Sequence, residues 1–384
     1  MLEGVNVALG VSGSIAAVKT VELAHELRRH GASVRAVMTD SARGIIHPWS
    51  LEFATDRPVV TEITGRVEHV ELCGYDGWAD VLLLAPSTAN TLGKLASAVD
   101  DTPVTTCATT ALGAGIPVVV APAMHAPMYD HPGVLDAIET LEGWDVAFVE
   151  PRLEEGKAKI ATEEAIVLDV ARAVGDDPLA GRHVVVTSGP TSEPIDPVRV
   201  LSNRASGRTG RAVAKACYAR GADVTLVHDG PAVPYADVRR VETAHEMLDA
   251  VMDATSSADA LVSAAAIGDY TVDPAAEKLR SGQELTLELE PTPKVIDTVR
   301  DDAPDLPIVG FKVESSGDDD AMVGVARETL DRVGLAFVVA NDASVMGEDE
   351  TRVLVVRADR VDEYAGSKAE IGAHVADELV AELS

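Results

Sequence analysis

Three features are scarce in this sequence, and two of these scarcities each exclude a class of protein. No run of about 18 apolar residues occurs, so a membrane-spanning helix is not expected. Only three cysteines are present, and the spacing of Cys73, Cys107 and Cys217 fits neither a disulfide framework nor a zinc knuckle. Lysine is the third scarce feature, with nine lysines beside 23 arginines.

Acidic residues dominate instead. Lys and Arg total 32, Asp and Glu total 63, and the formal net charge is -31. That charge argues against binding to nucleic acid or to anionic lipid, because both require basic surface. Hydrophobic residues make up 46% of the chain and charged residues 25%, which is a normal globular balance. We expect a cytoplasmic protein whose acidic surface is adapted to concentrated salt, or alternatively an acidic protein without that adaptation.

Two segments begin in the same way and predict the domain organisation. The apolar run Val5–Gly10 leads through a Gly-bearing loop to a helical pattern at Val18–Arg29, and Arg182–Ser188 leads to another at Gly210–Arg220. Each segment is typical of a strand–helix–strand unit in a parallel, doubly wound sheet. We therefore predict two α/β domains, 1–177 and 178–384, joined near Gly175–Gly181. Further buried strands are predicted at Val81–Ala85, Pro117–Ala121, Ala260–Ser263, Ile308–Phe311, Ala336–Ala340 and Val353–Arg357.

The loop after the first strand departs from the dinucleotide-binding fingerprint. Gly10–Ile15 has no third glycine at the required offset, and the second strand ends in hydroxyl side chains, where an NAD enzyme has a carboxylate. The hydroxyls of Ser12, Ser14 and Thr39, with amides at helix N-termini, suit a terminal phosphate such as that of FMN. An ordinary Gly/Ser turn with helix caps is the alternative.

Two further loops and one histidine extend this pattern. Pro86–Asn90 reads PSTAN, Pro122–Tyr129 reads PAMHAPMY, and His69 lies three residues before Leu72. Together with the Gly-Ser-Ile loop, these motifs resemble the flavin-containing cysteine decarboxylases. The resemblance implies a flavodoxin-like domain that binds FMN. The cofactor-binding residues it implies are Gly13, Ser14, Ile15, Thr39, Ser87, Thr88, Asn90, Ala121 and Met124.

The resemblance also implies a chemical role for His69. Loss of CO₂ from a C-terminal cysteine needs an electron sink, and a flavin provides one by oxidising the thiol. A base must take the thiol proton, and histidine suits that task near neutral pH. Taken alone, His69 would more often be a structural residue. The surrounding motifs favour the catalytic interpretation.

Two departures from the bacterial pattern concern the substrate. Position 125 is His in place of Asn, and we keep His125 as substrate-binding together with Met128. The bacterial enzymes carry a cysteine on a substrate clamp, whereas the corresponding stretch here, 151–159, has none. Lys157 or Lys159 could act as proton donor or hold the substrate carboxylate. A solvated loop is the alternative for this stretch.

The second half resembles the phosphopantothenate–cysteine ligase half of the bifunctional coenzyme A biosynthesis family. The stretch 182–210, RHVVVTSGPTSEPIDPVRVLSNRASGRTG, matches almost continuously, and motifs at 264–270, 291–296, 310–311 and 340–342 follow in family order. The resemblance implies a Rossmann-like domain in which CTP activates a carboxylate as an acyl-cytidylate. Asn203 would hold that activated group and Lys278 would contact the triphosphate. The nucleotide site would further comprise Ser263, Ala264, Ala265, Asp269, Pro293, Lys294, Val295, Ile296 and Phe311.

One departure affects the phosphate contacts of the ligase half. The bacterial ligases carry two lysines on the helix before the Ala-Asn-Asp motif, where this chain has Arg327 and Arg332. Either arginine could replace these lysines as a phosphate contact, since a guanidinium fork suits phosphate oxygens. We assign Arg332 to the substrate-binding set. Mg²⁺ is implied by the triphosphate, and no carboxylate cage for it is visible in the sequence.

The two resemblances together predict a bifunctional enzyme. The second half would join 4′-phosphopantothenate to cysteine with CTP, and the first half would decarboxylate the product to 4′-phosphopantetheine with FMN. A homo-oligomer is implied by the resemblance alone. Two alternatives remain: a flavin-binding domain that has lost catalysis and regulates a partner, or an active ligase fused to a decarboxylase of altered substrate choice.

Overall fold

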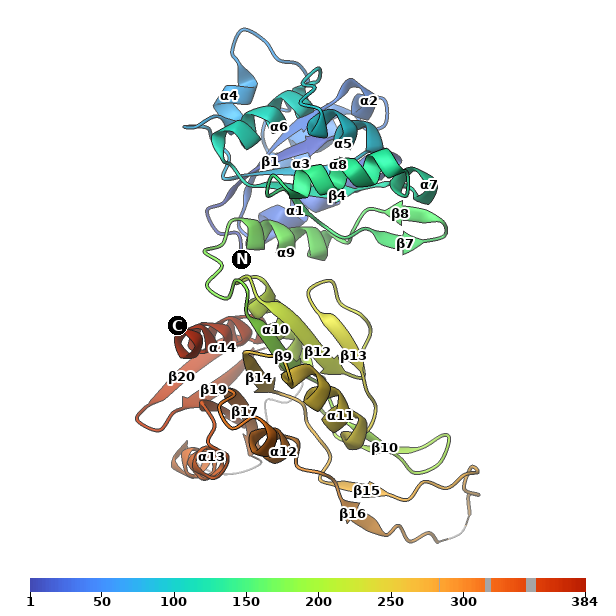
Figure 1. The fold of residues 1–384 in the computed structure, drawn as a ribbon, viewed down its shortest axis with the longest axis vertical. Helices are drawn as coiled ribbons and strands as arrows, with labels where there is room; N and C mark the ends of the chain where they lie inside the picture. The colour runs from blue at the N-terminus through green and yellow to red at the C-terminus, as the bar shows by residue number, and fades with distance from the viewer. Residues whose placement is uncertain (283, 315–318, 343–349) are drawn as a thin grey trace. The chain divides into compact units, whose positions relative to one another are not determined.

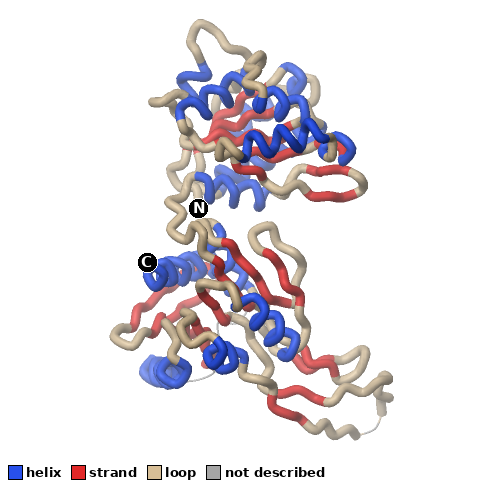
Figure 2. Tube along the Cα trace, viewed as in Figure 1, coloured by secondary structure: helices blue, strands red, loops and turns tan. Residues whose placement is uncertain are grey.

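The chain folds into two compact α/β units, Met1–Gly175 and Asp176–Ser384. Figure 1 shows the ribbon of a computed structural model, which describes residues 1–282, 284–314, 319–342 and 350–384. Each unit has a central sheet with helices on both faces (Figure 2). Doubly wound α/β folds were predicted for both halves, and the structure confirms them.

The N-terminal unit contains a five-stranded parallel sheet in the order β2-β1-β3-β4-β6. Its strands are continuous apolar runs because helices cover both faces. The strands are β1 Asn6–Val11, β2 Ser33–Met38, β3 Val81–Ser87, β4 Val118–Pro122 and β6 Ala147–Phe148. The helices are η1 Ile15–Lys19, a 3-10 turn, α1 Thr20–Arg29, α2 Asp40–Arg43, α3 Pro48–Thr55, α4 Glu68–Cys73, α5 Ala89–Ala96, α6 Pro103–Ala114, α7 Ala126–Tyr129, α8 Pro132–Glu142 and α9 Glu163–Ala173.

Alternation along the strands divides the core of this unit into two layers. Val7 and Leu9 of β1 pack with Leu23 of α1, while Ala8 between them packs with Leu92 of α5. Helices α1, α3 and α9 therefore cover one face, and α4, α5, α6 and α8 cover the other. A small antiparallel sheet, β5 Met124–His125, β8 Lys157–Lys159 and β7 Arg152–Glu154, stands beside this core.

The C-terminal unit contains an eight-stranded sheet in the order β13-β12-β9-β14-β17-β18-β19-β20. The first six strands in this order are parallel, and β19 and β20 are each antiparallel to the preceding strand. The bounds are β9 His183–Thr187, β12 Asp223–His228, β13 Asp237–Arg240, β14 Ala260–Ser263, β17 Ile308–Glu314, β18 Phe337–Asp342, β19 Glu350–Val356 and β20 Val361–Ser367.

Among the residues that the structure describes, five helices cover this second sheet. Helices α11, α12 and α13 cover one face and share one apolar cluster with strands β12, β9, β14, β17, β18 and β19. Helices α10 and α14 pack together on the strands from the other side. The bounds are α10 Arg208–Tyr218, α11 Ala244–Thr255, α12 Val295–Asp302, α13 Asp319–Val333 and α14 Lys368–Leu383. Two hairpins lie outside the sheet, β10 Ser192–Pro194 with β11 Val200–Ser202 and β15 Tyr270–Val272 with β16 Leu289–Pro291.

Candidate active sites at two strand switch points

The strand order of the N-terminal sheet reverses between β1 and β3, and the loops after these strands diverge there. Ligands of open α/β sheets bind at such a switch point, at the carboxyl ends of the strands. The loop after β1 is braced against the end of β3, because Ser12 Oγ donates to the carbonyl of Pro86 in β3 at 2.7 Å. The predicted FMN-binding residues come from this edge of the sheet.

The loop after β1 is shaped by two close contacts. Ser14 accepts a hydrogen bond from the Ala16 amide, and its hydroxyl donates to the Ala123 carbonyl after β4 at 3.2 Å. A side chain at Gly13 would bring its Cβ within 2.3 Å of Ser41 Cβ in α2, so only glycine fits where this loop passes the helix. Ile15 follows with 77% of its surface exposed.

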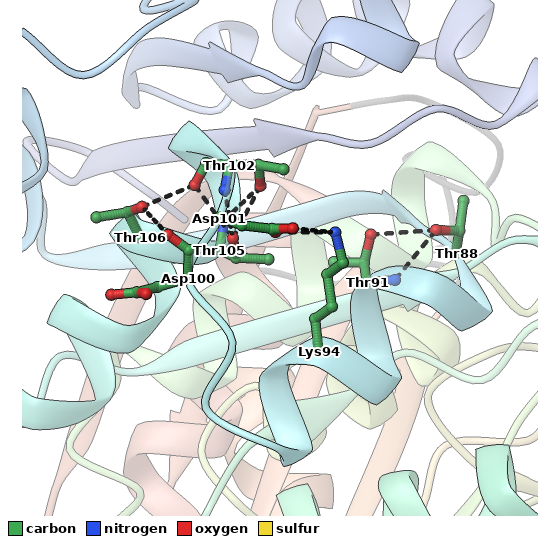
Figure 3. A network of polar contacts seen from close by, with 8 residues as sticks. All are labelled: Thr88, Thr91, Lys94, Asp100, Asp101, Thr102, Thr105 and Thr106. Carbon is green, nitrogen blue, oxygen red and sulfur yellow. Dashed lines mark hydrogen bonds and ion pairs between the residues drawn. The ribbon is translucent and has the colours of Figure 1, made fainter.

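Threonines begin two helices at the same edge. Thr39 caps α2 by accepting from the Ala42 amide, and Thr88 caps α5 by accepting from the Thr91 amide at 3.3 Å. Figure 3 shows Thr88 and Thr91 beside the ion pair of Lys94 with Asp101, whose shortest distance is 2.8 Å. The hydroxyls of Thr39 and Thr88 therefore fix the loops that lead into α2 and α5. Asn90, in the first turn of α5, is exposed.

Two buried polar atoms in this unit have no hydrogen-bond partner in the part of the chain that the structure describes. One is Oγ of Ser87, a fully buried residue at the end of β3, and the other is Nδ1 of His69 in α4. Buried polar atoms are usually satisfied, so each needs a partner that protein atoms do not provide. Ala121 is also buried, at the end of β4.

The small sheet brings the predicted substrate-binding residues together. His125 of β5 lies opposite Lys157 of β8 in antiparallel register, and Met124 lies opposite Ala158. Directly opposite residues of an antiparallel pair place their side chains on the same face. Lys159 is engaged elsewhere, because its ammonium lies 3.1 Å from Glu154 and 2.9 Å from Glu155. Met128 in α7 is 47% exposed.

The second sheet has its own switch point, between β9 and β14. A pocket of about 560 Å³ opens there along the carboxyl edge of the sheet. Five predicted ligase residues line it: Asn203, Ala264, Ala265, Asp269 and Phe311. Ser263 is the last residue of β14, directly before this lining, and is 9% exposed.

Hydrogen bonds between two loops form the floor of this pocket. The Ala266 amide donates to the Gly189 carbonyl at 2.8 Å, and the Thr191 amide donates to the Ala266 carbonyl at 3.2 Å. Asn203 Nδ2 donates to the same Ala266 carbonyl at 2.8 Å, which fixes its amide plane beside the loop after β14. The Asn203 side chain still has a second N–H and its oxygen for a ligand.

The segment 293–296 reaches the pocket through one ion pair. Lys294 Nζ lies 2.6 Å from Oδ1 of Asp269, and the Thr292 amide donates to the Asp269 carbonyl at 3.1 Å. Val295 is buried in the apolar cluster, and Pro293 and Ile296 are half-buried. These three side chains are not part of the pocket lining, so only Lys294 is brought to a predicted pocket residue by a direct contact.

Two predicted residues lie away from the pocket. Lys278 is exposed on the segment between β15 and β16 and does not line the pocket. Arg332 on α13 pairs with Asp297 on α12 at 2.6 Å and likewise does not line it. The structure thus brings together the loop residues at the strand ends, but not these two cations.

The pocket also contains residues that the sequence reasoning missed as site residues. Arg204 and Arg208 come from the SNRASGRTG stretch, where their basic character in an acidic chain was an available signal. Thr351 and Lys368 come from the antiparallel end of the sheet. Nothing local in the sequence indicated that β19 and β20 return beside β18, so these two could not have been found.

The described residues contain no group of three or more His, Cys, Asp or Glu side chains that could hold a metal ion. They also contain no helix long and apolar enough to cross a membrane.

Comparison with known proteins first establishes the class. Residues 1–175 match the family described as Flavoprotein, and residues 179–383 match the DNA/pantothenate metabolism flavoprotein C-terminal domain. The chain is therefore a flavoprotein domain joined to a pantothenate-metabolism domain, as the sequence motifs predicted.

Relatives of the whole chain then establish the family. The coenzyme A biosynthesis bifunctional protein CoaBC of Thermococcus kodakarensis is 48% identical over 364 residues, which cover 93% of this chain and 90% of that protein. The protein of the same name from Methanocaldococcus jannaschii is 35% identical, over 99% of this chain and 94% of its own length. This chain belongs to the CoaBC family of bifunctional coenzyme A biosynthesis enzymes, and the predicted family is confirmed.

A solved structure matches the C-terminal half. The crystal structure of the C-terminal domain of a coenzyme A biosynthesis bifunctional protein CoaBC is 27% identical, with a TM-score of 0.47. The match covers 54% of this chain and 98% of that structure.

Proposed function

We propose that the C-terminal unit joins 4′-phosphopantothenate to cysteine at the expense of CTP, and that the N-terminal unit decarboxylates the product to 4′-phosphopantetheine with FMN. The observation that carries this proposal is the second-unit pocket, where Asn203 and Asp269 converge at a strand switch point. Family membership supports the pairing of the two activities.

The ligase reaction begins with a carboxylate that must become a good acyl donor. In our proposal the carboxylate attacks the α-phosphate of CTP, pyrophosphate leaves, and the cysteine amine then displaces CMP from the acyl-cytidylate. The amide of Asn203 is suited to donate to an acyl or phosphoryl oxygen that gains negative charge. Its position supports this role, because its hydrogen bond to Ala266 orients the side chain before substrate binds.

Nucleotide recognition falls to the loop after β14 and the start of α12. In this proposal the backbone of Ser263–Ala265 and of Pro293–Ile296, with Phe311, encloses the nucleotide, and of these Ala264, Ala265 and Phe311 line the pocket. Asp269 contacts the nucleotide while paired with Lys294. Lys278 on the β15–β16 segment and Arg332 on α13 are proposed as further cations for the triphosphate. Both lie outside the pocket lining, so they would contact the part of the triphosphate that extends beyond it. Mg²⁺ enters with the triphosphate, since nucleotide phosphates and water supply most of its oxygen ligands in such sites.

The decarboxylase site is assigned to the switch point of the first sheet. Bound FMN would supply two-electron redox chemistry at the substrate carbon that bears the thiol, and with it the electron sink that loss of CO₂ requires. The end of β3 fits the cofactor, because Ser87 Oγ is buried and unsatisfied among the described residues. Nδ1 of His69, in α4, is buried and unsatisfied among these residues as well. The remaining FMN contacts come from Gly13, Ser14, Ile15, Thr39, Thr88, Asn90, Ala121 and Met124.

The chain itself moves the proton and holds the substrate. His69 takes the proton of the substrate thiol, which strengthens the sulfur as an electron donor. His125 and Lys157, opposite each other on the small sheet, hold the substrate carboxylate until CO₂ leaves, with Met128 against the aliphatic chain. Of the two clamp lysines, Lys157 is favoured because Lys159 is already paired with two glutamates.

The setting in the cell is part of the proposal. A net charge of -31 and the absence of a membrane-spanning helix among the described residues support a cytoplasmic enzyme that binds neither nucleic acid nor membrane. Its partners are then the small-molecule substrates 4′-phosphopantothenate, cysteine and CTP. We further propose that it works as a homo-oligomer.

One incubation tests both activities. The purified protein, in concentrated KCl, is supplied with 4′-phosphopantothenate, cysteine, CTP and Mg²⁺, and the products are weighed by mass spectrometry. Appearance of 4′-phosphopantetheine is the expected result. Reactions without CTP, and with ATP in its place, are the controls for the activation step.

Other outcomes are equally informative. If only the cysteine adduct accumulates, the flavoprotein domain has another substrate or a regulatory role. If supplied 4′-phosphopantothenoyl-cysteine is decarboxylated but no adduct forms from its precursors, the ligase assignment is wrong. Absence of both products from folded, flavin-loaded protein contradicts the whole proposal.

A further inference from the structure

Two of the three cysteines of this chain meet inside the N-terminal unit. Cys73 is the last residue of α4, Cys107 lies in α6, and the two helices pack together (Figure 1). Both side chains are fully buried in the same apolar cluster. The thiol of Cys107 donates a hydrogen bond to the sulfur of Cys73, so the two sulfur atoms are direct neighbours. Their sequence spacing gave no sign of this, because they belong to different helices.

The thiol of Cys107 is protected while α4 is folded. Its hydrogen bond to Cys73 and its burial raise the pKa of Cys107 well above the usual value, so the thiol is protonated near neutral pH. The thiolate is the form that attacks a disulfide. We therefore expect the two cysteines to react only during a local opening of the structure that admits water and an oxidant.

Helix α4 has the features of an element that opens locally. It has only six residues, and so short a helix is marginal by itself. Its N-cap residue, Val67, has a φ of 50°, a left-handed conformation that is unfavourable for a β-branched side chain. The apolar side chain of Val67 cannot accept a hydrogen bond from the first turn. Val67 and Val70 are 49% and 48% exposed, so little packing holds the start of the helix.

The proposed general base lies on the same helix. His69 precedes Cys73 by four residues, so the two side chains share one face of α4. Nδ1 of His69 is buried without a partner among the described residues, so α4 itself sets its position. A disulfide bond would hold the two sulfur atoms at about 2.05 Å, much closer than two hydrogen-bonded thiols. Its formation would draw the last turn of α4 toward α6 and displace His69 with it.

We propose that Cys73 and Cys107 form a reversible disulfide that switches off the decarboxylase unit by displacing His69. This inference rests on the proposed function of that unit and adds a regulatory modification to it. The oxidant is a low-molecular-weight disulfide, represented by cystine, the oxidised form of the proposed ligase substrate cysteine. The two protein thiols lose two electrons and two protons and become joined by one S–S bond. The S–S bond of cystine breaks, and two molecules of cysteine leave with these protons.

The test compares reduced protein with protein that was incubated with cystine and then separated from it by gel filtration. Peptide mapping should show two peptides joined through Cys73 and Cys107, lighter by two hydrogen atoms than the reduced pair. Initial rates of decarboxylation of supplied 4′-phosphopantothenoyl-cysteine should fall about ten- to a hundredfold, because a displacement of about 1 Å can cost that much. Dithiothreitol should restore them. Folded protein that remains reduced, or a disulfide without loss of activity, overturns the proposal.

Matched variants and the second unit serve as controls. Cys107→Ala and Cys73→Ala each remove one partner, so cystine should not inhibit either variant. Cys217→Ala removes the third buried thiol, on α10 of the other unit, and should remain as sensitive as wild type. Release of pyrophosphate from CTP and 4′-phosphopantothenate, measured without cysteine because it would reduce the bond, should be unchanged by oxidation. Inhibition of Cys107→Ala by cystine, or an equal loss of pyrophosphate release, would overturn the assignment.

Amide hydrogen exchange of the peptide that contains α4 keeps this inference distinct from the proposed function. If the reduced protein does not decarboxylate, the proposed function fails, but the effect of the bond on α4 can still be measured. A cross-link to α6 opposes the local opening of α4, so exchange within residues 68–73 should slow about tenfold or more in the oxidised protein. Equal exchange in oxidised and reduced protein contradicts the coupling between this disulfide and the helix that carries His69.

Discussion

The carboxylate of Asp196 accepts a hydrogen bond from the backbone amide of Leu279, 83 residues later in the chain, at 3.1 Å. Its other oxygen accepts from the amides of Val198 at 2.8 Å and Arg199 at 2.9 Å. Arg199 in turn donates to the Leu279 carbonyl at 2.7 Å. Leu279 directly follows Lys278, so this buried carboxylate anchors the segment that carries the proposed triphosphate contact.

We predict that Asp196→Ala impairs ligation without affecting decarboxylation. Loss of the anchor lets the Lys278 segment shift, and a misplacement of about 1 Å can cost about a hundredfold in rate. Ligase kcat is measured with CTP, and decarboxylase activity with supplied 4′-phosphopantothenoyl-cysteine on the same preparation. Equal loss of both activities, or loss of neither, would contradict an anchoring role.

The pKa of Asp196 determines in which direction the stability of this anchor changes with pH. Burial raises the pKa of Asp196, but the amide hydrogen bonds from Val198, Leu279 and Arg199, with the Arg199 charge, outweigh it and hold the pKa below its usual value. A depressed pKa adds stability above the unfolded-state value, and that stability is lost as pH falls through the folded-state value. Ligase activity near neutral pH should therefore not depend on titration of Asp196, and an activity change centred between pH 6 and 8 must come from another group.

The two proposed active sites should respond independently to mutation. His69→Asn is expected to lower decarboxylation by about a hundred- to ten-thousandfold, the usual contribution of a general base, while CTP-dependent ligation continues. Lys278→Gln should do the reverse, because it removes a cation from the triphosphate. Both variants are assayed for both activities after circular dichroism shows native folding. If either folded variant loses both activities, the model of two separate sites is wrong.

Most strands of the two central sheets could be predicted because they are locally apolar. The predicted strand Ala260–Ser263 coincides with β14, and the predicted strand at Pro117–Ala121 differs from β4 by one residue at each end. The helix predicted at Val18–Arg29 begins earlier, as a 3-10 turn from Ile15, because Ser14 caps it. Strand-end loops were therefore placed correctly, and five predicted ligase residues line one pocket.

The remaining parts depend on pairing between distant segments. The hairpin of β15 and β16 joins Tyr270 to Pro291 and has no long apolar run to indicate it. Lys368 reaches the pocket only because β19 and β20 return antiparallel beside β18. The pairing of Lys159 with Glu154 and Glu155 depends on the turn between β7 and β8. Such relationships come from tertiary structure and leave no periodicity in the sequence.

Two serines at the flavoprotein switch point provide a matched pair. Ser87 Oγ is buried without a partner among the described residues, whereas Ser12 Oγ is buried and donates to the Pro86 carbonyl at 2.7 Å. We predict that Ser87→Ala weakens FMN binding about tenfold but leaves the stability of the flavin-free protein unchanged. Ser12→Ala should lower that stability by about 1 kcal/mol, since it removes a satisfied hydrogen bond.

Flavin fluorescence titration and thermal unfolding of flavin-free protein measure the two effects. Ser87→Thr, which keeps a hydroxyl, is the control for hydrogen bonding to the cofactor. A Ser87→Ala protein that binds FMN as tightly as wild type would show that this hydroxyl does not contact the flavin.

The two lysines of the clamp should differ in their effects. Lys157→Gln is expected to raise KM for 4′-phosphopantothenoyl-cysteine about tenfold or more, because a cation opposite His125 is lost from the proposed carboxylate site. Lys159→Gln removes exposed ion pairs with Glu154 and Glu155, which contribute little to stability, so KM should change less than twofold. KM is measured for both variants in the decarboxylation reaction. A larger increase in KM for Lys159→Gln than for Lys157→Gln would reverse the assignment.

Salt should continue to stabilise this protein at concentrations where electrostatic screening is already nearly complete. With a net charge of -31, the compact state repels itself at low ionic strength, where the screening length is about 30 Å at 0.01 M. An acidic protein without salt adaptation gains most of its stability by about 0.15 M, because screening has then shortened to about 8 Å. For a surface adapted to concentrated salt, we predict that Tm continues to rise in KCl above about 1 M, where further screening is small.

Thermal unfolding across a KCl series measures this rise in Tm, with the charge-neutral osmolyte sucrose as a control for solvent exclusion. Full stability and activity without added salt would contradict the adaptation.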